Sequence, residues 1–292
     1  MATGVRVFRA RGGVDWSTYA ACRPVYPPSF FQRIYAYHGA KPQAAWSQAH
    51  DVGTGTGIVS AGLAGKFDRV VMSDPNDGYA ALGYKIMVDE LGIPAAKLAF
   101  LQEGAEKSSV VSGSVDLVTA CEMIHWTDTG AAVDEFHRQL KAGGTVVIAY
   151  YSRPRIVGNA AAQRVLRGIF GVYAEKIGAL GVLYDRGLRI VNSGLENVEL
   201  PGAKWRRVEP FALDDRTAES KVGEGEEKIL EEAGEDWMDV KGIDWFKPYF
   251  ATWTPRVPDE EIQDLWDQLE ATLSGQHVKV ETPVVLIFGT KV

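Results

Sequence analysis

The stretch from His50 to Ile58, His-Asp-Val-Gly-Thr-Gly-Thr-Gly-Ile, constrains the fold of this chain more than any other. Gly53, Gly55 and Gly57 stand at every second position, so the backbone can turn sharply and approach a ligand that any Cβ would displace. A turn of this kind between a strand and a helix suits a nucleoside cofactor, because the first N–H groups of the helix and the bare backbone can surround it. We therefore expect a strand closed by Asp51, then a ligand-binding turn, then a helix.

The spacing of these glycines separates two kinds of nucleotide site. The dinucleotide fingerprint Gly-x-Gly-x-x-Gly requires a glycine at position 58, where this chain has Ile58, so a dehydrogenase is disfavoured. The sequence Asp-Val-Gly-Thr-Gly-Thr-Gly instead resembles the first motif of class I S-adenosylmethionine-dependent methyltransferases, in which the acidic residue and the turn hold the methionine half of the cofactor. The resemblance implies S-adenosylmethionine as the cofactor, with contacts from Asp51, Gly53, Thr54, Gly55 and Gly57.

Composition and charge exclude several other classes. With 292 residues, 46% of them apolar, the chain can bury the core of one large α/β domain with an insertion. A formal net charge of −7 argues against nucleic-acid binding, and we interpret the acidic run 219–239 as solvated. Cys22 and Cys121 have no Cys or His partner at metal-ligand spacing, so we expect neither a disulfide framework nor a metal. No signal peptide or membrane span is apparent, which predicts a cytoplasmic protein with no membrane partner.

The first half of the chain alternates strand and helix patterns. Strands are expected at 44–52, 69–74, 98–102, 115–121 and 145–151, and helices at 29–39, 58–66, 78–91 and 128–140, the first capped by Ser29 and the last by Asp128. This alternation predicts a doubly wound α/β fold, a mostly parallel seven-stranded sheet with helices on both faces. The ligand should lie at the carboxyl ends of the strands.

The second half is less regular. A helix at 160–177 precedes irregular sequence, a strand near 205–211, an aromatic stretch at 237–253, a helix at 260–273 and a last strand near 283–290. The two strands should pair as an antiparallel edge of the sheet. We thus divide the chain into an N-terminal arm and helix (1–40), a cofactor-binding core (41–155) and the rest of the core with a helical substrate-lid insertion (156–292). The aromatic stretch packs either as core of the insertion or as a lid lined with aromatics.

Three short segments at expected strand ends carry further chemistry. Asp74, followed by Pro75, stands where a carboxylate can accept both ribose hydroxyls, although a helix-capping acid is the alternative. Ala105 and Glu106 follow the third strand, either beside the adenine or in a plain surface turn. After the fourth strand, apolar and aromatic groups can shield a sulfonium. The candidate cofactor or substrate contacts there are Ala120, Cys121, His125 and Trp126, although Trp126 is equally consistent with a core residue.

These features together are similar to class I methyltransferases, and the resemblance implies a Rossmann-like methyltransferase fold. Two further segments, Tyr19 with Arg23-Pro24-x-Tyr26-Pro27 and Tyr249-Phe-Ala-Thr-Trp253, resemble the trans-aconitate methyltransferase-like subgroup of fungi. That likeness implies that Tyr19 and Arg23 also contact the cofactor. It thins between 178 and 235, where substrate contacts are expected to diverge.

The predicted reaction is methyl transfer to an oxygen of a small organic acid or secondary metabolite. A carboxylate acceptor needs only cations or donors to place it, for which Arg23, Arg153 and Arg155 are candidates, whereas a hydroxyl needs a base such as His125. A protein that binds the cofactor without transferring its methyl group, as a scaffold or partner subunit, is the alternative. We expect acceptor contacts from Tyr26, Trp126, Tyr151, Arg153, Trp245, Tyr249 and Trp253.

Overall fold

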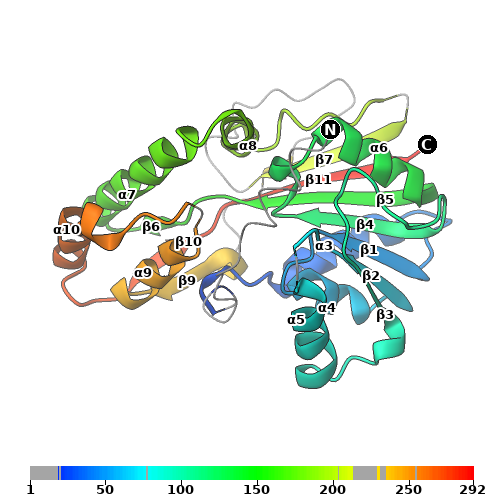
Figure 1. Ribbon diagram of the computed structural model, residues 1–292, viewed down its shortest axis with the longest axis horizontal. Helices are drawn as coiled ribbons and strands as arrows, with labels where there is room; N and C mark the ends of the chain where they lie inside the picture. Colours follow the sequence, from blue (N-terminus) through cyan, green and yellow to red (C-terminus); the bar gives the residue numbers. More distant parts are fainter. Residues whose placement is uncertain are drawn as a thin grey trace.

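The computed structural model describes residues 19, 21–76, 78–202, 204–212, 229–230, 235–253 and 255–292. The part of the expected N-terminal arm before Tyr19 and most of the acidic run lie outside these residues. Figure 1 shows a large twisted sheet with helices above and below it, and a group of helices and short strands at one end.

The main sheet has the order β3-β2-β1-β4-β5-β11-β7-β8. Five pairs of neighbouring strands are parallel, including β7 with β8, whereas β11 runs antiparallel to both β5 and β7. The predicted mostly parallel sheet with an antiparallel edge is thus confirmed, and a two-residue strand, β8, extends it beyond the expected seven. The strands are β1 (Gln48–Val52), β2 (Arg69–Ser73), β3 (Leu98–Leu101), β4 (Val115–Cys121), β5 (Leu140–Tyr151), β7 (Trp205–Ala212), β8 (Ile229–Leu230) and β11 (Val284–Lys291).

Helices cover both faces of this sheet, because successive side chains of a strand point to opposite faces and apolar residues occupy both sets of positions. In β5, Val147 and Ala149 belong to the hydrophobic cluster that also contains α3 (Pro28–Gly39), α4 (Ile58–Ala64) and Met87 of a π-helix (Lys85–Glu90), which continues the helix α5 (Tyr79–Tyr84). Val146 and Ile148 point to the opposite face, toward α6 (Thr129–Gln139) and α8 (Val182–Asn192). Short 3₁₀ turns occur at Ala95–Lys97, Ile124–Trp126, Glu235–Trp237 and Asp259–Glu261.

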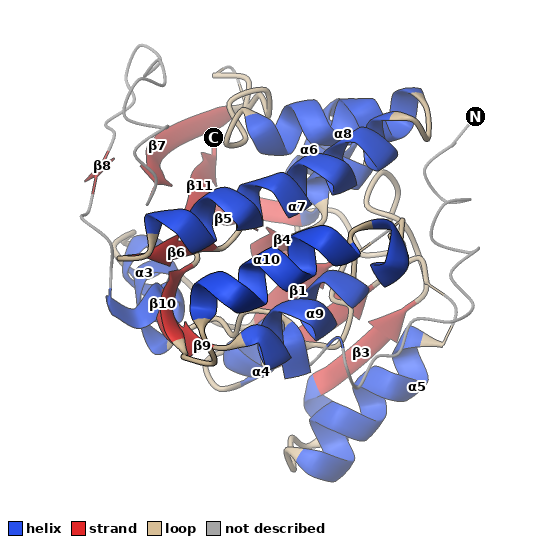
Figure 2. Ribbon diagram, turned by 90° about the vertical axis from the view of Figure 1, so that its left-hand side faces the viewer, coloured by secondary structure: helices blue, strands red, loops and turns tan. Residues whose placement is uncertain are grey.

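A third hydrophobic cluster lies outside the main sheet. It joins α7 (Ala160–Gly178), α9 (Ile243–Ala251) and α10 (Gln263–Leu273) to a small antiparallel sheet. That sheet contains β6 (Arg155–Val157), β10 (Val278–Glu281) and β9 (Met238–Lys241), in this order. We call these six elements the peripheral unit; Figure 2 shows its three helices side by side.

Four local expectations were wrong. Residues 182–192 form α8, where we expected irregular structure. Gly187 lowers the helix propensity of this segment. The glycine allows close packing, because a Cβ there would lie 3.0 Å from the carbonyl oxygen of His125, which the helix crosses. The first helix begins at Pro28, so Ser29 is not its cap. Strand β5 begins at Leu140, before the glycines that were expected to separate it from the helix. The small sheet was not anticipated, because its strands are only three or four residues long.

Asp128 caps α6 as predicted, accepting a hydrogen bond from the Ala131 N–H. Among the described residues, no helix combines the length and the apolar character that a membrane span requires.

Candidate functional site

The glycine turn follows β1 and is held against the end of β2. The N–H groups of Gly53 and Thr54 both donate to the Ser73 carbonyl oxygen, at 2.8 and 3.0 Å. Gly53 has φ +68°, and a Cβ there would lie 2.6 Å from the Cβ of Met123. Gly55 also has positive φ, yet a Cβ there would meet nothing within 4 Å. The turn therefore packs tightly on one side and is bare on the other, as a ligand that approaches backbone requires.

Asp51 braces this turn from beneath. Its carboxylate is 2% exposed and accepts hydrogen bonds from the hydroxyls of Thr54, Ser60 and Thr119 at 3.0, 2.6 and 2.7 Å. Burial raises the pKa of Asp51, while the three hydroxyl donors act to lower it. Since the side chain is already surrounded by protein donors, Asp51 shapes the glycine turn more than it offers a free carboxylate to a ligand.

Strand β1 carries a polar residue, His50, where a parallel strand usually carries valine or isoleucine, and its hydrogen bonds explain why it is accommodated there. Gln139 donates its amide N–H to Glu135, so its oxygen faces His50 and accepts from Nδ1 at 2.6 Å. Nε2 then accepts from the Ser73 hydroxyl at 2.8 Å. Burial lowers the pKa of His50 to about 4, so the ring is neutral in the folded protein.

Asp74 lies beside the glycine turn because β1 and β2 are in parallel register, with Val52 opposite Ser73. One carboxylate oxygen accepts from the Gly55 N–H at 3.0 Å and the other from the Asn76 N–H at 2.8 Å. A carboxylate is the kind of group that accepts hydrogen bonds from ribose hydroxyls. The bare face of Gly55 and this adjacent carboxylate fit the nucleoside part of S-adenosylmethionine. Pro75 follows in the same bend and is half-buried.

The residues expected near the adenine are partly engaged in other contacts. Ala105 is buried in the hydrophobic cluster beneath α6. Glu106 accepts a hydrogen bond from the Asp128 N–H at 3.0 Å, at the start of that helix. Both remain near the carboxyl end of β3, but the Ala105 side chain packs into the core.

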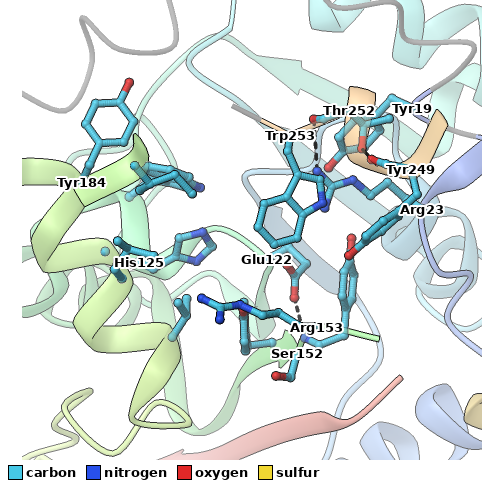
Figure 3. A pocket seen from close by; sticks show the side chains of 17 residues that line it. Tyr19, Arg23, Glu122, His125, Ser152, Arg153, Tyr184, Tyr249, Thr252 and Trp253 are labelled. Carbon is cyan, nitrogen blue, oxygen red and sulfur yellow. Dashed lines mark hydrogen bonds between the residues drawn. The ribbon is translucent and has the colours of Figure 1, made fainter. Parts of the chain in front are cut away.

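A cavity opens at the carboxyl ends of β4 and β5 (Figure 3), and we call it the acceptor pocket after the role that we propose for it below. Its walls come from five parts of the chain: the segment before α3, the ends of β4 and β5, the end of α7, α8, and the end of α9. Aromatic side chains predominate, with a carboxylate and two guanidinium groups among them. The lining residues are Tyr19, Arg23, Glu122, His125, Trp126, Tyr150, Tyr151, Ser152, Arg153, Ile177, Tyr184, Gly187, Leu188, Val191, Tyr249, Thr252 and Trp253.

Arg23 closes one side of the acceptor pocket. Its guanidinium lies 4.8 Å from the ring centre of Tyr19 and 5.6 Å from that of Tyr249, and it donates to the Thr252 carbonyl oxygen at 3.2 Å. The Nε atom is buried and has no hydrogen-bond partner among the described residues. A buried unsatisfied donor on a cation suits an anionic or carbonyl oxygen of a ligand, such as the cofactor carboxylate.

His125 and Trp126 lie in the 3₁₀ turn after β4, on the opposite side of the pocket. The His125 ring packs against Trp126 at 4.8 Å and against Tyr150 at 5.8 Å between ring centres. Trp126 meets Tyr184 of α8 edge to face at 5.6 Å. The structure therefore brings both predicted residues to the pocket, as it does Tyr151, Arg153, Tyr249 and Trp253.

Other selected side chains lie elsewhere. Tyr26 packs against Phe30, Tyr151 and Trp237, and Ala120 and Cys121 are buried on opposite faces of the sheet. Trp245 stacks on Tyr249 from behind, at 4.7 Å, and lines a separate cavity. Arg155 forms an ion pair with Glu281 in the small sheet. Ala120 and Cys121 stand at the end of β4 but still between the helices that cover the two faces of the sheet, so their side chains are buried. Arg155 is already paired with a buried carboxylate, that of Glu281.

Glu122 is a charged residue of the pocket lining that our sequence analysis missed. It has φ +57°, a left-handed conformation uncommon outside glycine, and its Oε1 accepts from the Tyr151 N–H at 2.5 Å. Burial raises the pKa of Glu122 to about 8, opposed by the Tyr151 N–H and the Arg23 charge. An acidic residue directly after a buried strand was the available signal, and the same signal had identified Asp74.

Comparisons with known proteins agree with this geometry. Residues 50–148 match the family described as "Methyltransferase domain". The chain is 30% identical to Methyltransferase cfoB of Aspergillus candidus, over 95% of this chain and 94% of the relative. It is 28% identical to Methyltransferase pgmE of Aspergillus terreus, over 95% of this chain and 93% of that protein.

Among solved structures, the chain is similar to a candidate type II methyltransferase from Anaeromyxobacter dehalogenans. The TM-score is 0.64 at 19% identity, and the match covers 92% of this chain and 97% of that one. At this identity the likeness concerns the fold. The Rossmann-like arrangement of strands and helices is therefore shared well beyond the fungal relatives.

Proposed function

The chain belongs to the class I S-adenosylmethionine-dependent methyltransferases, and on this premise we propose that it transfers the methyl group to an oxygen of a small molecule bound in the acceptor pocket. S-adenosylmethionine supplies an electrophilic methyl group on a positively charged sulfur. The residues suited to hold this cofactor are Asp74 and the turn from Gly53 to Gly57, with Arg23 for its carboxylate. The expected acceptors are small organic acids or secondary metabolites.

The observation that carries the proposal is the position of the acceptor pocket. It opens at the carboxyl end of β4, the strand next to β1 and its glycine turn, and it is walled by aromatic rings. In-line displacement at carbon depends mainly on alignment and on exclusion of water. The peripheral unit and the segment around Arg23 would provide that enclosure, which is the role we propose for the expected lid.

The methylated oxygen can belong to a carboxylate or to a hydroxyl. Arg153 lines the pocket and could place a carboxylate, whereas a hydroxyl needs a group that accepts its proton. The names of the compared fungal relatives give the transferase activity without an acceptor. Assignment to the trans-aconitate methyltransferase-like subgroup likewise stays a prediction.

Calorimetry with S-adenosylhomocysteine tests the cofactor part. The unmodified chain should bind it, and Asp74→Asn should weaken binding about tenfold or more, because hydrogen bonds to a carboxylate contribute about 1.5–3 kcal/mol. Asp68→Asn is the matched control, since Asp68 is exposed and lies before β2 instead of after it. Absence of binding to the unmodified chain would overturn the proposal.

Isotope-labelled S-adenosylmethionine then separates transfer from binding alone. Incubation with a panel of small hydroxyl and carboxyl acceptors should give labelled product. The alternative function, a cofactor-binding scaffold without transfer, predicts binding with no product from any acceptor.

A further inference from the structure

We propose that Glu122 is the general base of the acceptor pocket and that the acceptor is a neutral phenolic hydroxyl on a flat aromatic molecule. This inference rests on the proposed methyl transfer and names its acceptor class. It assigns the proton-accepting role to a residue other than His125.

The backbone aims Glu122 at the pocket. At the end of β4 its N–H donates to the Ala149 carbonyl oxygen at 2.9 Å, so the sheet pairing still holds the residue. The left-handed conformation then turns its side chain over the end of β5, where Oε1 accepts from the Tyr151 N–H. The second oxygen, Oε2, accepts no hydrogen bond from any described residue. One oxygen is therefore fixed, and the other is available to a ligand in the pocket that the residue lines.

The surroundings keep this carboxylate basic. In Figure 3, Glu122 is drawn between His125 on one side and Arg23 on the other, with Trp253 above it. Burial raises its pKa to about 8, and Arg23 is the cation that limits the rise. Other titratable groups interact with it from the neighbouring elements, namely Tyr26, Cys121, Tyr150, Tyr151 and Tyr249, and burial raises the pKa of each. These groups stay neutral while Glu122 titrates, and His125 and Arg153 face the same space.

The pKa of Glu122 favours a phenol over other acceptors. A phenolic hydroxyl has a pKa near 10, about two units above that of Glu122, so proton transfer becomes favourable as the oxygen loses electron density to the methyl carbon. Glu122 must be ionised to accept a proton, and beside the ionised Glu122 a carboxylate acceptor would place a second negative charge in a desolvated pocket, which is unfavourable. The rings of Trp126, Tyr184 and Trp253 offer faces and edges to a flat aromatic body.

The step balances without a further reactant. A lone pair of the acceptor oxygen forms the bond to the methyl carbon, and the sulfur–carbon bond breaks with its electron pair going to sulfur. The hydroxyl proton passes to Oε2 of Glu122, which later releases it to solvent. The products are the methyl ether, neutral S-adenosylhomocysteine and one proton.

The first test measures binding without turnover. Calorimetry with a naphthol, in the presence of S-adenosylhomocysteine, should show about fivefold tighter binding at about pH 8.5 than at about pH 6.5, because the ionised Glu122 accepts the hydroxyl hydrogen bond. Glu122→Gln should reduce this change to less than about twofold. His125→Gln should retain the wild-type change. A change that His125→Gln abolishes and Glu122→Gln leaves intact would overturn the assignment.

The second test compares matched phenols and aromatic carboxylates, beginning with the naphthol and the corresponding naphthoate. We expect methylation of the phenol, a wild-type kcat/KM that rises with pH to a plateau above about pH 8, and a loss of about 10²-fold or more in kcat for Glu122→Gln. Its affinity for S-adenosylhomocysteine should stay within about twofold of wild type. The wild-type pH profile needs no variant, so it decides even if Glu122→Gln folds poorly.

The outcomes distinguish this inference from the proposed function. Methylation of carboxylates but of no phenol, or a flat pH profile with phenols, overturns the role of Glu122 and leaves oxygen methylation standing. Failure of the unmodified chain to bind S-adenosylhomocysteine overturns both.

Discussion

Replacing His50 with glutamine should remove a component of acid sensitivity that the wild-type protein carries in β1. The ring is 1% exposed, and burial lowers its pKa to about 4, below the ordinary value of about 6.5 that it regains in the unfolded chain. The native state therefore resists a proton that the unfolded state takes up. The stability from neutral His50 is fully present above about pH 6.5 and is lost as the pH falls toward about 4.

The size of the effect follows from these two pKa values. At about pH 5 the unfolded chain carries nearly one extra proton at this site, which lowers the free energy of unfolding by about 2 kcal/mol relative to about pH 7. Below about pH 4 the loss approaches about 3.4 kcal/mol, at 1.36 kcal/mol for each pKa unit. Few single groups in a domain of this size would shift stability as much over this range.

Urea unfolding of both proteins at about pH 7 and about pH 5 measures the difference. We expect the wild-type protein to lose about 2 kcal/mol more than His50→Gln between these conditions. Lower stability of the variant at neutral pH does not affect the comparison, since other titrating groups such as His38 are present in both proteins. Equal losses, within about 0.5 kcal/mol, would show that His50 is not held neutral by its burial.

Two further predictions concern packing around the site. Gly53→Ala should cost about 1–3 kcal/mol more than Gly92→Ala, because their φ angles are nearly equal, +68° and +67°, but only at Gly53 would the new Cβ meet another side chain, that of Met123. Equal losses in urea unfolding would mean that Met123 moves aside freely. Arg155→Met should cost about 3 kcal/mol in thermal unfolding, since Glu281, whose side chain is 4% exposed, loses its cation. Adding Glu281→Gln should recover part of that loss, and a single-variant cost below about 1 kcal/mol would contradict the buried ion pair.

The placement of the glycine turn and Asp74 at one edge of the sheet was predictable from the sequence. The three glycines and Asp74 stand directly after buried strands, and parallel strands bring such positions to one edge of the sheet. The polar residue His50 made β1 look like a poor strand, although its partners Ser73 and Gln139 satisfy it fully. Those partners lie on β2 and α6, so the sequence of β1 alone could not show that a neutral histidine fits there.

The acceptor side was predictable only in part. Tyr151, Arg153, Tyr249 and Trp253 do line the acceptor pocket, but Tyr26 and Trp245, chosen for the same aromatic character, pack elsewhere. Aromatic type does not distinguish a wall of a cavity from the layer behind it. The helix α8 supplies Tyr184 to the pocket, and its interior glycine concealed it.

The sequence by itself determined the fold class and the cofactor turn, because the spacing of glycines and acidic residues after strands is local and the parallel sheet brings those ends together. Only the tertiary structure decided which side chains surround the acceptor pocket and how their pKa values shift. Glu122 is an acid after a strand just as Asp74 is, but its basicity depends on burial among Arg23, Tyr151 and Tyr249. These residues come from the segment before α3, from β5 and from α9, and folding alone brings them around one carboxylate.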